Sequence, residues 1–132
     1  MKKTYPPAVC VVIKKDNKYL CGSRPGTNDQ WGLIGGKVDP MERYDTAMVR
    51  ELFEETGIQI ESSDIMSIYI GLCGPGLDGR IFECMAFEYI GDVDKLNPKS
   101  MEDGILVDWR DEKDLITGPF AEYNKKLLES IK

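Results

Sequence analysis

The 132-residue chain contains no histidine. Histidine is therefore excluded as a nucleophile, general base or metal ligand, and any proton transfer falls to carboxylates. Basic residues are also scarce, with 17 Lys and Arg against 23 Asp and Glu and a formal net charge of −6. Proteins that bind nucleic acid polymers present a basic surface, so no such partner is expected. A small anionic substrate that arrives with a metal ion is compatible with this charge.

Long apolar runs are absent as well. No stretch approaches the roughly 18 apolar residues of a membrane-spanning helix, so no membrane partner is expected. Residues 1–7 lack the apolar region of a secretory signal, and a cytoplasmic protein is expected. The four cysteines form no C-x-x-C pair, which argues against a zinc site or redox motif and predicts reduced core residues: Cys10, Cys21, Cys73 and Cys84.

The length is close to the commonest domain size and predicts a single domain over residues 1–132. Apolar and β-branched segments predict strands at 8–14, 18–23, 31–34, 65–72, 80–89 and 104–109. Turns are expected at 15–17, 74–79 and 111–114. Apolar residues at helical spacing predict an amphipathic helix over residues 120–131. Strands interrupted by one central and one terminal helix predict an α/β fold, with a mixed sheet between helices.

Three glutamates, Glu51, Glu54 and Glu55, fall three and four residues apart. On a helix this spacing places their carboxylates on one face, about 5–6 Å apart, where like charges repel. A hard divalent cation relieves this repulsion, and Mg²⁺ typically binds one or two carboxylates together with substrate phosphates. The cluster predicts a metal site for phosphate chemistry. The competing interpretation is a solvated acidic helix face.

The surrounding residues complete a longer motif. Its spacing is G-x5-E-x7-R-E-U-x-E-E-x-G-U, where U is apolar, and every specified position is filled: Gly36, Glu42, Arg50, Glu51, Leu52, Glu54, Glu55, Gly57 and Ile58. The segment resembles the Nudix box, the loop-helix-loop signature of the Nudix hydrolases, which cleave a nucleoside diphosphate linked to another moiety. A motif with this many specified positions is far more specific than a short glycine pattern.

Local physical chemistry agrees with a loop followed by a helix. Gly35 and Gly36 predict a tight turn that brings a carbonyl close to the acidic face. Asp45 suits the first helical turn, where the helix dipole favours negative charge, and Gly57 suits the helix end. The side opposite the glutamates is predicted to face the core through Met48, Val49, Leu52 and Phe53. Two positions depart from the family pattern, which commonly has proline and glycine where this chain has Ile34 and Met41.

The resemblance implies a Nudix-type α/β/α sandwich and a set of metal ligands. Mg²⁺, or Mn²⁺ in its place, is expected on the Gly36 carbonyl and on the carboxylates of Glu51, Glu54 and Glu55. Arg50 is expected to hold a carboxylate through two hydrogen bonds.

Two further acidic assignments follow from the resemblance. Glu42 is expected to secure the loop rather than perform chemistry. The general base is left open between Glu51 and a later acidic residue, for which Glu102 is the first choice and Asp103 the second. An ordinary acidic turn is the alternative interpretation of this later segment.

The short chain resembles the MutT-type members, which hydrolyse nucleoside triphosphates to a monophosphate and pyrophosphate. Arg24 and Lys37 flank the glycine loop and are candidate phosphate ligands. Near the C-terminus, Phe120 or Tyr123 is a candidate for stacking on a base and Asn124 for hydrogen bonding to it. Aromatic residues at helical spacing are also typical of a core.

Other functions are weighed against this one. Hydrolysis of ADP-ribose or of a dinucleotide polyphosphate is the alternative enzyme activity, although no clear downstream proline or tyrosine signature supports it. A module that senses nucleotides without cleaving them is expected to lack a ligand on the acidic helix, and here Arg50 and all three glutamates are present. The expected partner is a small-molecule nucleotide. Base preference and the choice between monomer and homodimer are left open.

Overall fold

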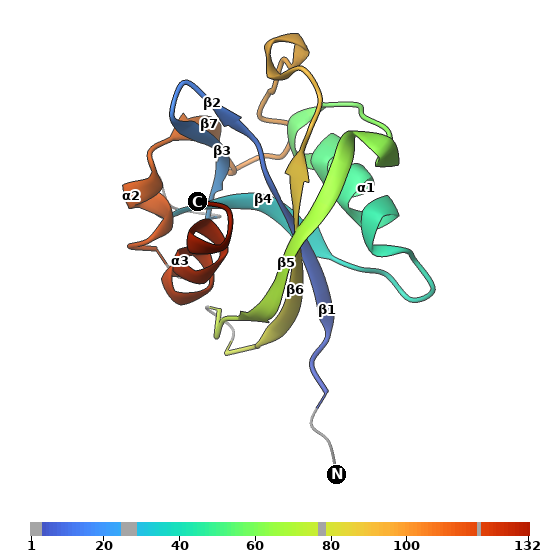
Figure 1. The fold of residues 1–132 in the computed structure, drawn as a ribbon, viewed down its shortest axis with the longest axis vertical. Coiled ribbons are helices and arrows are strands. Elements are labelled where there is room, and N and C mark those ends of the chain that lie inside the picture. The colour runs from blue at the N-terminus through green and yellow to red at the C-terminus, as the bar shows by residue number, and fades with distance from the viewer. Residues whose placement is uncertain (1–3, 25–28, 77–78, 119) are drawn as a thin grey trace.

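A mixed β-sheet runs through the middle of the molecule and has helices on both faces (Figure 1). The computed structural model describes residues 4–24, 29–76, 79–118 and 120–132. The strands are β1 (Pro7–Val12), β2 (Lys14–Lys15), β3 (Lys18–Ser23), β4 (Trp31–Lys37), β5 (Ile65–Cys73), β6 (Phe82–Tyr89) and β7 (Val107–Arg110). The helices are α1 (Tyr44–Thr56), α2 (Glu112–Leu115) and α3 (Ala121–Ser130), with 3-10 turns at Ser62–Asp64 and Val93–Lys95.

The strand order within the described residues is β2-β3-β4-β1-β6-β5, and β7 pairs with β3. Strands β1 and β6 are parallel, with Cys10 opposite Ala86, whereas the other pairs are antiparallel. The first half of β4 pairs with β3 and its second half with β1, so this strand joins the two parts of the sheet. The predicted α/β fold with a mixed sheet is confirmed.

Helix α1 covers one face of the sheet through a narrow apolar stripe. Met48 and Leu52 are fully buried and pack in a cluster with Val9 and Val11 of β1. The prediction that Phe53 also faces this core is wrong, since its side chain is 46% exposed. Successive helical residues are about 100° apart around the axis, so the residue after Leu52 points away from the line that Met48 and Leu52 share.

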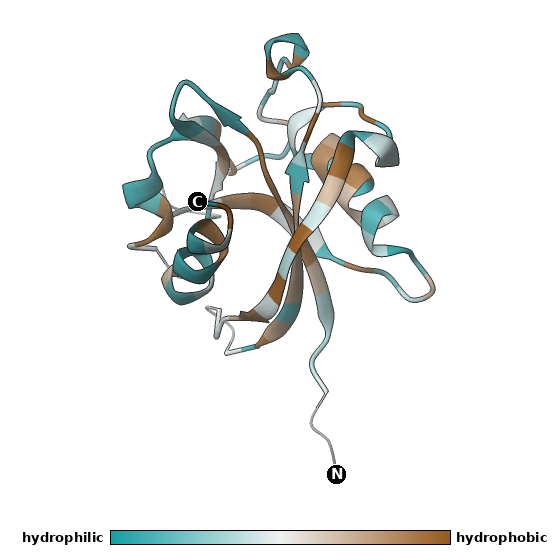
Figure 2. Ribbon diagram, viewed as in Figure 1, coloured by the Kyte–Doolittle hydropathy of each residue, from teal (hydrophilic) through white to brown (hydrophobic). Residues whose placement is uncertain are grey.

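Helix α3 covers the opposite face and confirms the predicted C-terminal helix. Leu127 and Leu128 are buried in a second cluster that includes Cys10 and Cys84. Tyr123 is also buried, and its hydroxyl donates a hydrogen bond to the Cys84 carbonyl at 3.0 Å. The two apolar clusters on either side of the sheet produce the alternation of apolar and polar segments visible in Figure 2. All four cysteines are free, and Cys73 is the one that is not fully buried.

Several boundaries differ from the sequence prediction. The polar segment 111–114 was expected to be a turn, but residues 112–115 form helix α2. Leu115, the last residue of α2, is fully buried and anchors this helical turn. The strand expected at 104–109 begins at Val107, after Gly104, whose φ is 83°. In the turn expected at 74–79, Gly76 donates a hydrogen bond to the Arg80 carbonyl at 3.0 Å, and residues 77–78 lie outside the described part.

No helix among the described residues has both the length and the apolar character needed to cross a membrane. The helices seen in Figure 1 are short and pack on the sheet.

Gly35 and Gly36 lie within strand β4, so the turn predicted there is wrong. At both positions a Cβ would come too close to a neighbour, which is backbone at Gly35 and a movable side chain at Gly36. A Cβ on Gly35 would overlap the carbonyl of Val9 and lie 2.9 Å from the Cα of Cys10. A Cβ on Gly36 would overlap the carboxylate of Glu51. The pair therefore lets β4 contact both its neighbouring strand and the acidic face of α1.

We predict that Gly35→Ala lowers the free energy of unfolding by at least about 2 kcal/mol, because the new methyl group meets backbone atoms that have no room to move. Gly32→Ala is the matched control in the same strand, since a Cβ there has nothing within 4 Å. Urea unfolding of both variants measures the difference. Equal stability of the two variants would contradict the packing described for β4.

Candidate active site

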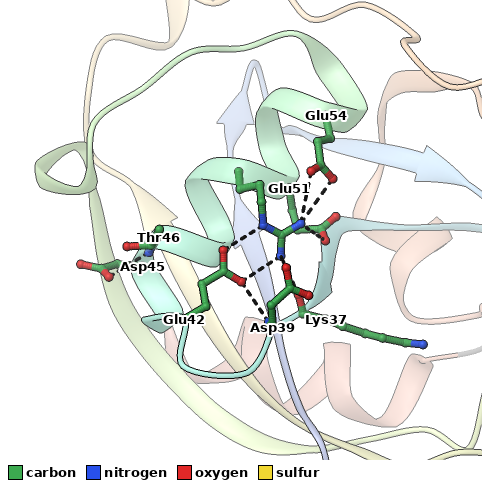
Figure 3. Close-up of polar contacts among 8 residues, drawn as sticks. Lys37, Asp39, Glu42, Asp45, Thr46, Glu51 and Glu54 are labelled. Atoms are coloured by element: carbon green, nitrogen blue, oxygen red, sulfur yellow. Dashed lines mark hydrogen bonds and ion pairs between the residues drawn. The ribbon is translucent and has the colours of Figure 1, made fainter.

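Arg50 lies among the carboxylates at the acidic face of α1. Its Nε and Nη2 donate to the two carboxylate oxygens of Glu42 at 2.8 and 2.9 Å. Its Nη1 donates to Glu51 at 3.0 Å and to Glu54 at 3.3 Å. In Figure 3, Glu42, Glu51 and Glu54 all point toward one guanidinium group. The bidentate pair expected for Arg50 is present, and its partner is Glu42.

The same guanidinium ties the loop between β4 and α1 to the helix. Nη2 of Arg50 donates to the Lys37 carbonyl at 3.1 Å and lies 3.5 Å from the Asp39 carboxylate. Glu42 accepts a further hydrogen bond from the Asp39 amide at 2.9 Å. The hydrogen bonds from Arg50 lower the pKa of Glu42 to about 2. The loop also holds Met41 with a φ of 68° and a fully exposed side chain, a left-handed conformation that favours glycine.

The other two box carboxylates lie in a less favourable environment for charge. Burial raises the pKa of Glu51, and Arg50 offsets part of this rise. Burial, together with the charges of Glu51 and Glu102, raises the pKa of Glu55 to about 8. Glu54 is more exposed, with 48% of its side chain accessible. The acidic face therefore carries electrostatic repulsion that Arg50 alone does not cancel.

The chemistry of these groups fits a hard divalent ion. The groups that could ligate a metal are carboxylate oxygens and the backbone carbonyl of Gly36, and the Glu51 carboxylate lies against this backbone. Mg²⁺ and Mn²⁺ favour such oxygen ligands. In this conformation Glu51 and Glu54 are engaged by Arg50. The described part of the chain holds no group of three or more Cys, Asp or Glu side chains already arranged around one point.

Glu102 lies on a segment that is fastened to the end of α1. The amide of Lys99 donates to the Thr56 carbonyl at 2.9 Å, and the amide of Met101 donates to the Glu55 carbonyl at 3.3 Å. The charge of Glu102 contributes to the raised pKa values of both Glu51 and Glu55. The structure therefore brings Glu102 to the acidic cluster, as its predicted role requires. Asp103 follows it on the same exposed loop.

A cavity of about 360 Å³ opens beside the acidic face, and Gly36 and Glu55 form part of its wall. All four predicted substrate residues line this cavity: Arg24, Lys37, Phe120 and Asn124. The Arg24 guanidinium lies 5.0 Å from the centre of the Phe120 ring. Figure 3 shows Lys37 extending away from the carboxylates, and its Nζ lies 5.9 Å from the centre of the Phe82 ring.

The two C-terminal polar candidates differ in what they offer a ligand. Asn124 is buried, and its Nδ2 donates to the Leu115 carbonyl at 2.9 Å, a bond that uses one N–H and does not engage the amide oxygen. Tyr123 packs edge-on to Tyr69, with ring centres 5.5 Å apart, and is a core residue. Tyr123 also lines this cavity, and the alternative in which it, and not Phe120, stacks on a base stays a prediction.

Sequence reasoning missed part of the site. Phe82 lines the cavity, and both Lys37 and Arg80 lie over its ring. Its position as the first residue of β6 identifies a strand residue but not which face of the sheet it occupies. Asp39 is a second omission, since nothing in the box marks it as a partner of Arg50. A different cavity of about 390 Å³ at the end of α1 is lined by Phe53, Gly57 and Met101 and contains none of the candidate residues.

Comparison with known proteins agrees with this geometry. The family model described as the NUDIX domain matches residues 4–129. The chain is 32% identical over 129 residues to the CTP pyrophosphohydrolase of Escherichia coli (strain K12), an alignment that covers 93% of this chain and 88% of that protein. This protein belongs to the Nudix family and is a Nudix hydrolase, a pyrophosphohydrolase that acts on phosphorus-containing anhydrides.

Solved structures share the fold. A MutT NUDIX hydrolase from Burkholderia pseudomallei superposes with a TM-score of 0.77 at 22% identity, covering 98% of this chain and 100% of that chain. The E. coli ORF135 protein superposes with a TM-score of 0.68 at 26% identity, covering 97% and 89% of the two chains. These similarities confirm the predicted Nudix-type α/β/α architecture.

We predict that Glu55→Gln stabilises the metal-free protein at alkaline pH. The folded state retains a proton on Glu55 up to about pH 8, whereas the unfolded chain loses it near the ordinary pKa of 4.5. Folding thus takes up a proton between these values, and the contribution of Glu55 to stability falls as the pH rises. We expect the variant to exceed the wild type by about 1 kcal/mol or more near pH 8 and to match it near pH 4.

Urea unfolding in EDTA, repeated across this pH range, measures that difference. Glu122→Gln is the surface control on α3 and is expected to change neither the stability nor its pH dependence. An unchanged pH slope in Glu55→Gln would show that Glu55 is not held in an unfavourable environment.

Proposed function

We propose that this Nudix hydrolase cleaves a nucleoside triphosphate to a nucleoside monophosphate and pyrophosphate, with Mg²⁺ or Mn²⁺ as cofactor. The observation that carries the proposal is that one cavity joins the acidic box to an aromatic and amide pair: Glu55 and Gly36 share its wall with Phe120 and Asn124. Its volume of about 360 Å³ lies within the range of roughly 300–1,000 Å³ that is typical of small-molecule sites.

The metal would be held by the Gly36 carbonyl and by the carboxylates of Glu51, Glu54 and Glu55. When bound, such an ion neutralises charge that builds on phosphoryl oxygens and lowers the pKa of an attacking water. Arg50 positions Glu51 and Glu54, because it fixes both carboxylates from one guanidinium nitrogen. Its contacts with Glu42 hold the loop that directly follows β4, the strand that contains Gly36.

The proton of the attacking water passes to a carboxylate. Glu102 is our choice for this general base, because its segment is bonded to the end of α1 and its side chain is exposed beside the cluster. Glu51 is less suitable, since it already accepts a hydrogen bond from Arg50 and lies against Gly36.

Arg24 and Lys37 supply positive charge for the phosphates, and Phe120 supplies a ring for the base. The free amide oxygen of Asn124 accepts a hydrogen bond, which suits a base with an exocyclic amino group. Cytosine is such a base, and the relative from E. coli is named for CTP. CTP is therefore the first triphosphate to test.

A product screen tests the proposed function. Canonical and oxidised nucleoside triphosphates, ADP-ribose and dinucleotide polyphosphates are incubated with Mg²⁺, and pyrophosphate is separated from phosphate. We expect monophosphate and pyrophosphate from a triphosphate. Glu54→Gln is the control and is expected to lower kcat by about 100-fold or more without changing the circular dichroism spectrum, because it removes ligand charge.

Other outcomes of the screen would revise the proposal. Turnover of ADP-ribose or dinucleotide polyphosphates alone would replace the triphosphate substrate. Full activity of Glu54→Gln would show that the metal site is placed wrongly. Nucleotide binding without turnover of any compound would indicate a sensor instead of an enzyme acting on these substrates.

We predict that Glu102→Gln lowers kcat by about 100-fold or more, since a positioned general base typically contributes at least this factor. The neighbouring change Asp103→Asn is the matched control. It removes one charge from the same loop but keeps the proposed general base, so kcat is expected to change by less than about threefold. Steady-state kinetics at saturating substrate compare the two. The reverse ranking would assign the base to Asp103, and activity in both variants would assign it to Glu51.

A further inference from the structure

Strand β5 forms one edge of the sheet and carries no charged residue along its nine positions, Ile65–Cys73. Three of its large apolar side chains are half exposed: Met66 at 50%, Ile70 at 49% and Leu72 at 52%. In Figure 2, brown bands alternate with pale ones along β5. In a chain with 30% charged residues, this is an unusual edge.

Edge strands are normally protected by charged residues, proline, short length or a bulge, because their outward backbone groups are free to pair with another strand. β5 has one such device, a shift in register between Ser67 and Tyr69. Beyond it, residues 69–73 pair regularly with residues 82–86 of β6. Within the described part of the chain, no strand pairs with the outer edge of this second half of β5, which carries no charged residue.

The side chains of this half are divided between two faces. Tyr69 and Cys73 pack toward the cluster beneath α3. Ile70 and Leu72 alternate with them and therefore point to the other face, where both are half exposed. Between them, Gly71 carries no side chain, and a Cβ there would lie 2.8 Å from the hydroxyl of Tyr69. The segment is nearly symmetric about Gly71, with one exposed apolar residue on each side.

We propose that β5 pairs antiparallel with β5 of a second copy of this chain, with the two-fold axis passing at Gly71. In that register Ile70 lies opposite Leu72 of the partner subunit, and the reverse pair forms on the other side of the axis. Antiparallel pairs directly opposite each other are in side-chain contact. A two-fold contact must be self-complementary, and the symmetric order of residues 69–73 meets this requirement.

The charge and the size of the contact indicate a weak dimer. Each copy has a net charge of −6, so the two repel at long range, and an uncharged strand is the part of the surface where they approach at least cost. Five paired residues are few compared with the roughly 800 Å² that each partner buries in a standard stable interface. We expect a dissociation constant in the micromolar range or weaker, and tighter association in added NaCl, which screens the repulsion.

Two double variants test the register. Ile70→Lys with Leu72→Lys places lysine opposite lysine across the axis and is expected to abolish the dimer. Ile70→Lys with Leu72→Glu places opposite charges together in both pairs and is expected to retain it. Ile90→Lys changes an apolar residue of similar exposure, 55%, outside the strands and serves as control. Sedimentation velocity from about 1 μM to about 1 mM measures association of each protein.

The expected result is a concentration-dependent dimer for the wild type, the Ile90→Lys control and the opposite-charge variant, and a monomer for the two-lysine variant. A wild-type monomer at every concentration would overturn the proposal, as would equal association of the two double variants. Amide hydrogen exchange of the wild type gives a second measurement that needs no variant. Protection of residues 69–73 must rise with concentration, and unchanged protection there contradicts the pairing.

Discussion

The structure of the site depends on the partly buried guanidinium group of Arg50 and on the carboxylates around it. A guanidinium group has donors in a rigid plane, so one side chain can fix several acceptors at once. Here it joins the loop after β4, through Glu42 and the Lys37 carbonyl, to the helix face, through Glu51 and Glu54. Loop and helix thereby become one unit, and the position of each catalytic candidate follows from it.

This arrangement leaves the acidic face short of positive charge. Hydrogen bonds from Arg50 lower the pKa of Glu42 to about 2, whereas burial and neighbouring carboxylates raise the pKa of Glu55 to about 8. The steric constraint acts in the same place, because glycine at position 36 lets the Glu51 carboxylate lie against the backbone of β4. A protein optimised for stability alone would not keep like charges together at such a contact. Their presence together is what the divalent-cation site that we propose for this hydrolase requires.

The structural elements whose signals lie within one short segment could be predicted from the sequence. The helix from Tyr44 to Thr56 and its glycine end follow from residues within one segment, and the structure reproduces both. Features that depend on distant packing were not predictable in this way. The parallel pairing of β1 with β6 and the helical turn anchored by Leu115 each follow from the tertiary neighbours of those segments. The place of Phe82 in the cavity wall was likewise not predictable, since alternation along a strand does not identify the face that borders a ligand.

Met41 changes how the conformation of the box loop is maintained. Glycine at this position would adopt the left-handed backbone without strain, whereas methionine adopts it at a cost and contributes no buried surface in return. The hydrogen bonds among Asp39, Glu42 and Arg50 must supply the difference. The conformation of this loop therefore depends on charged contacts as well as on backbone preference, and the low pKa of Glu42 keeps its carboxylate ionised for those contacts at neutral pH.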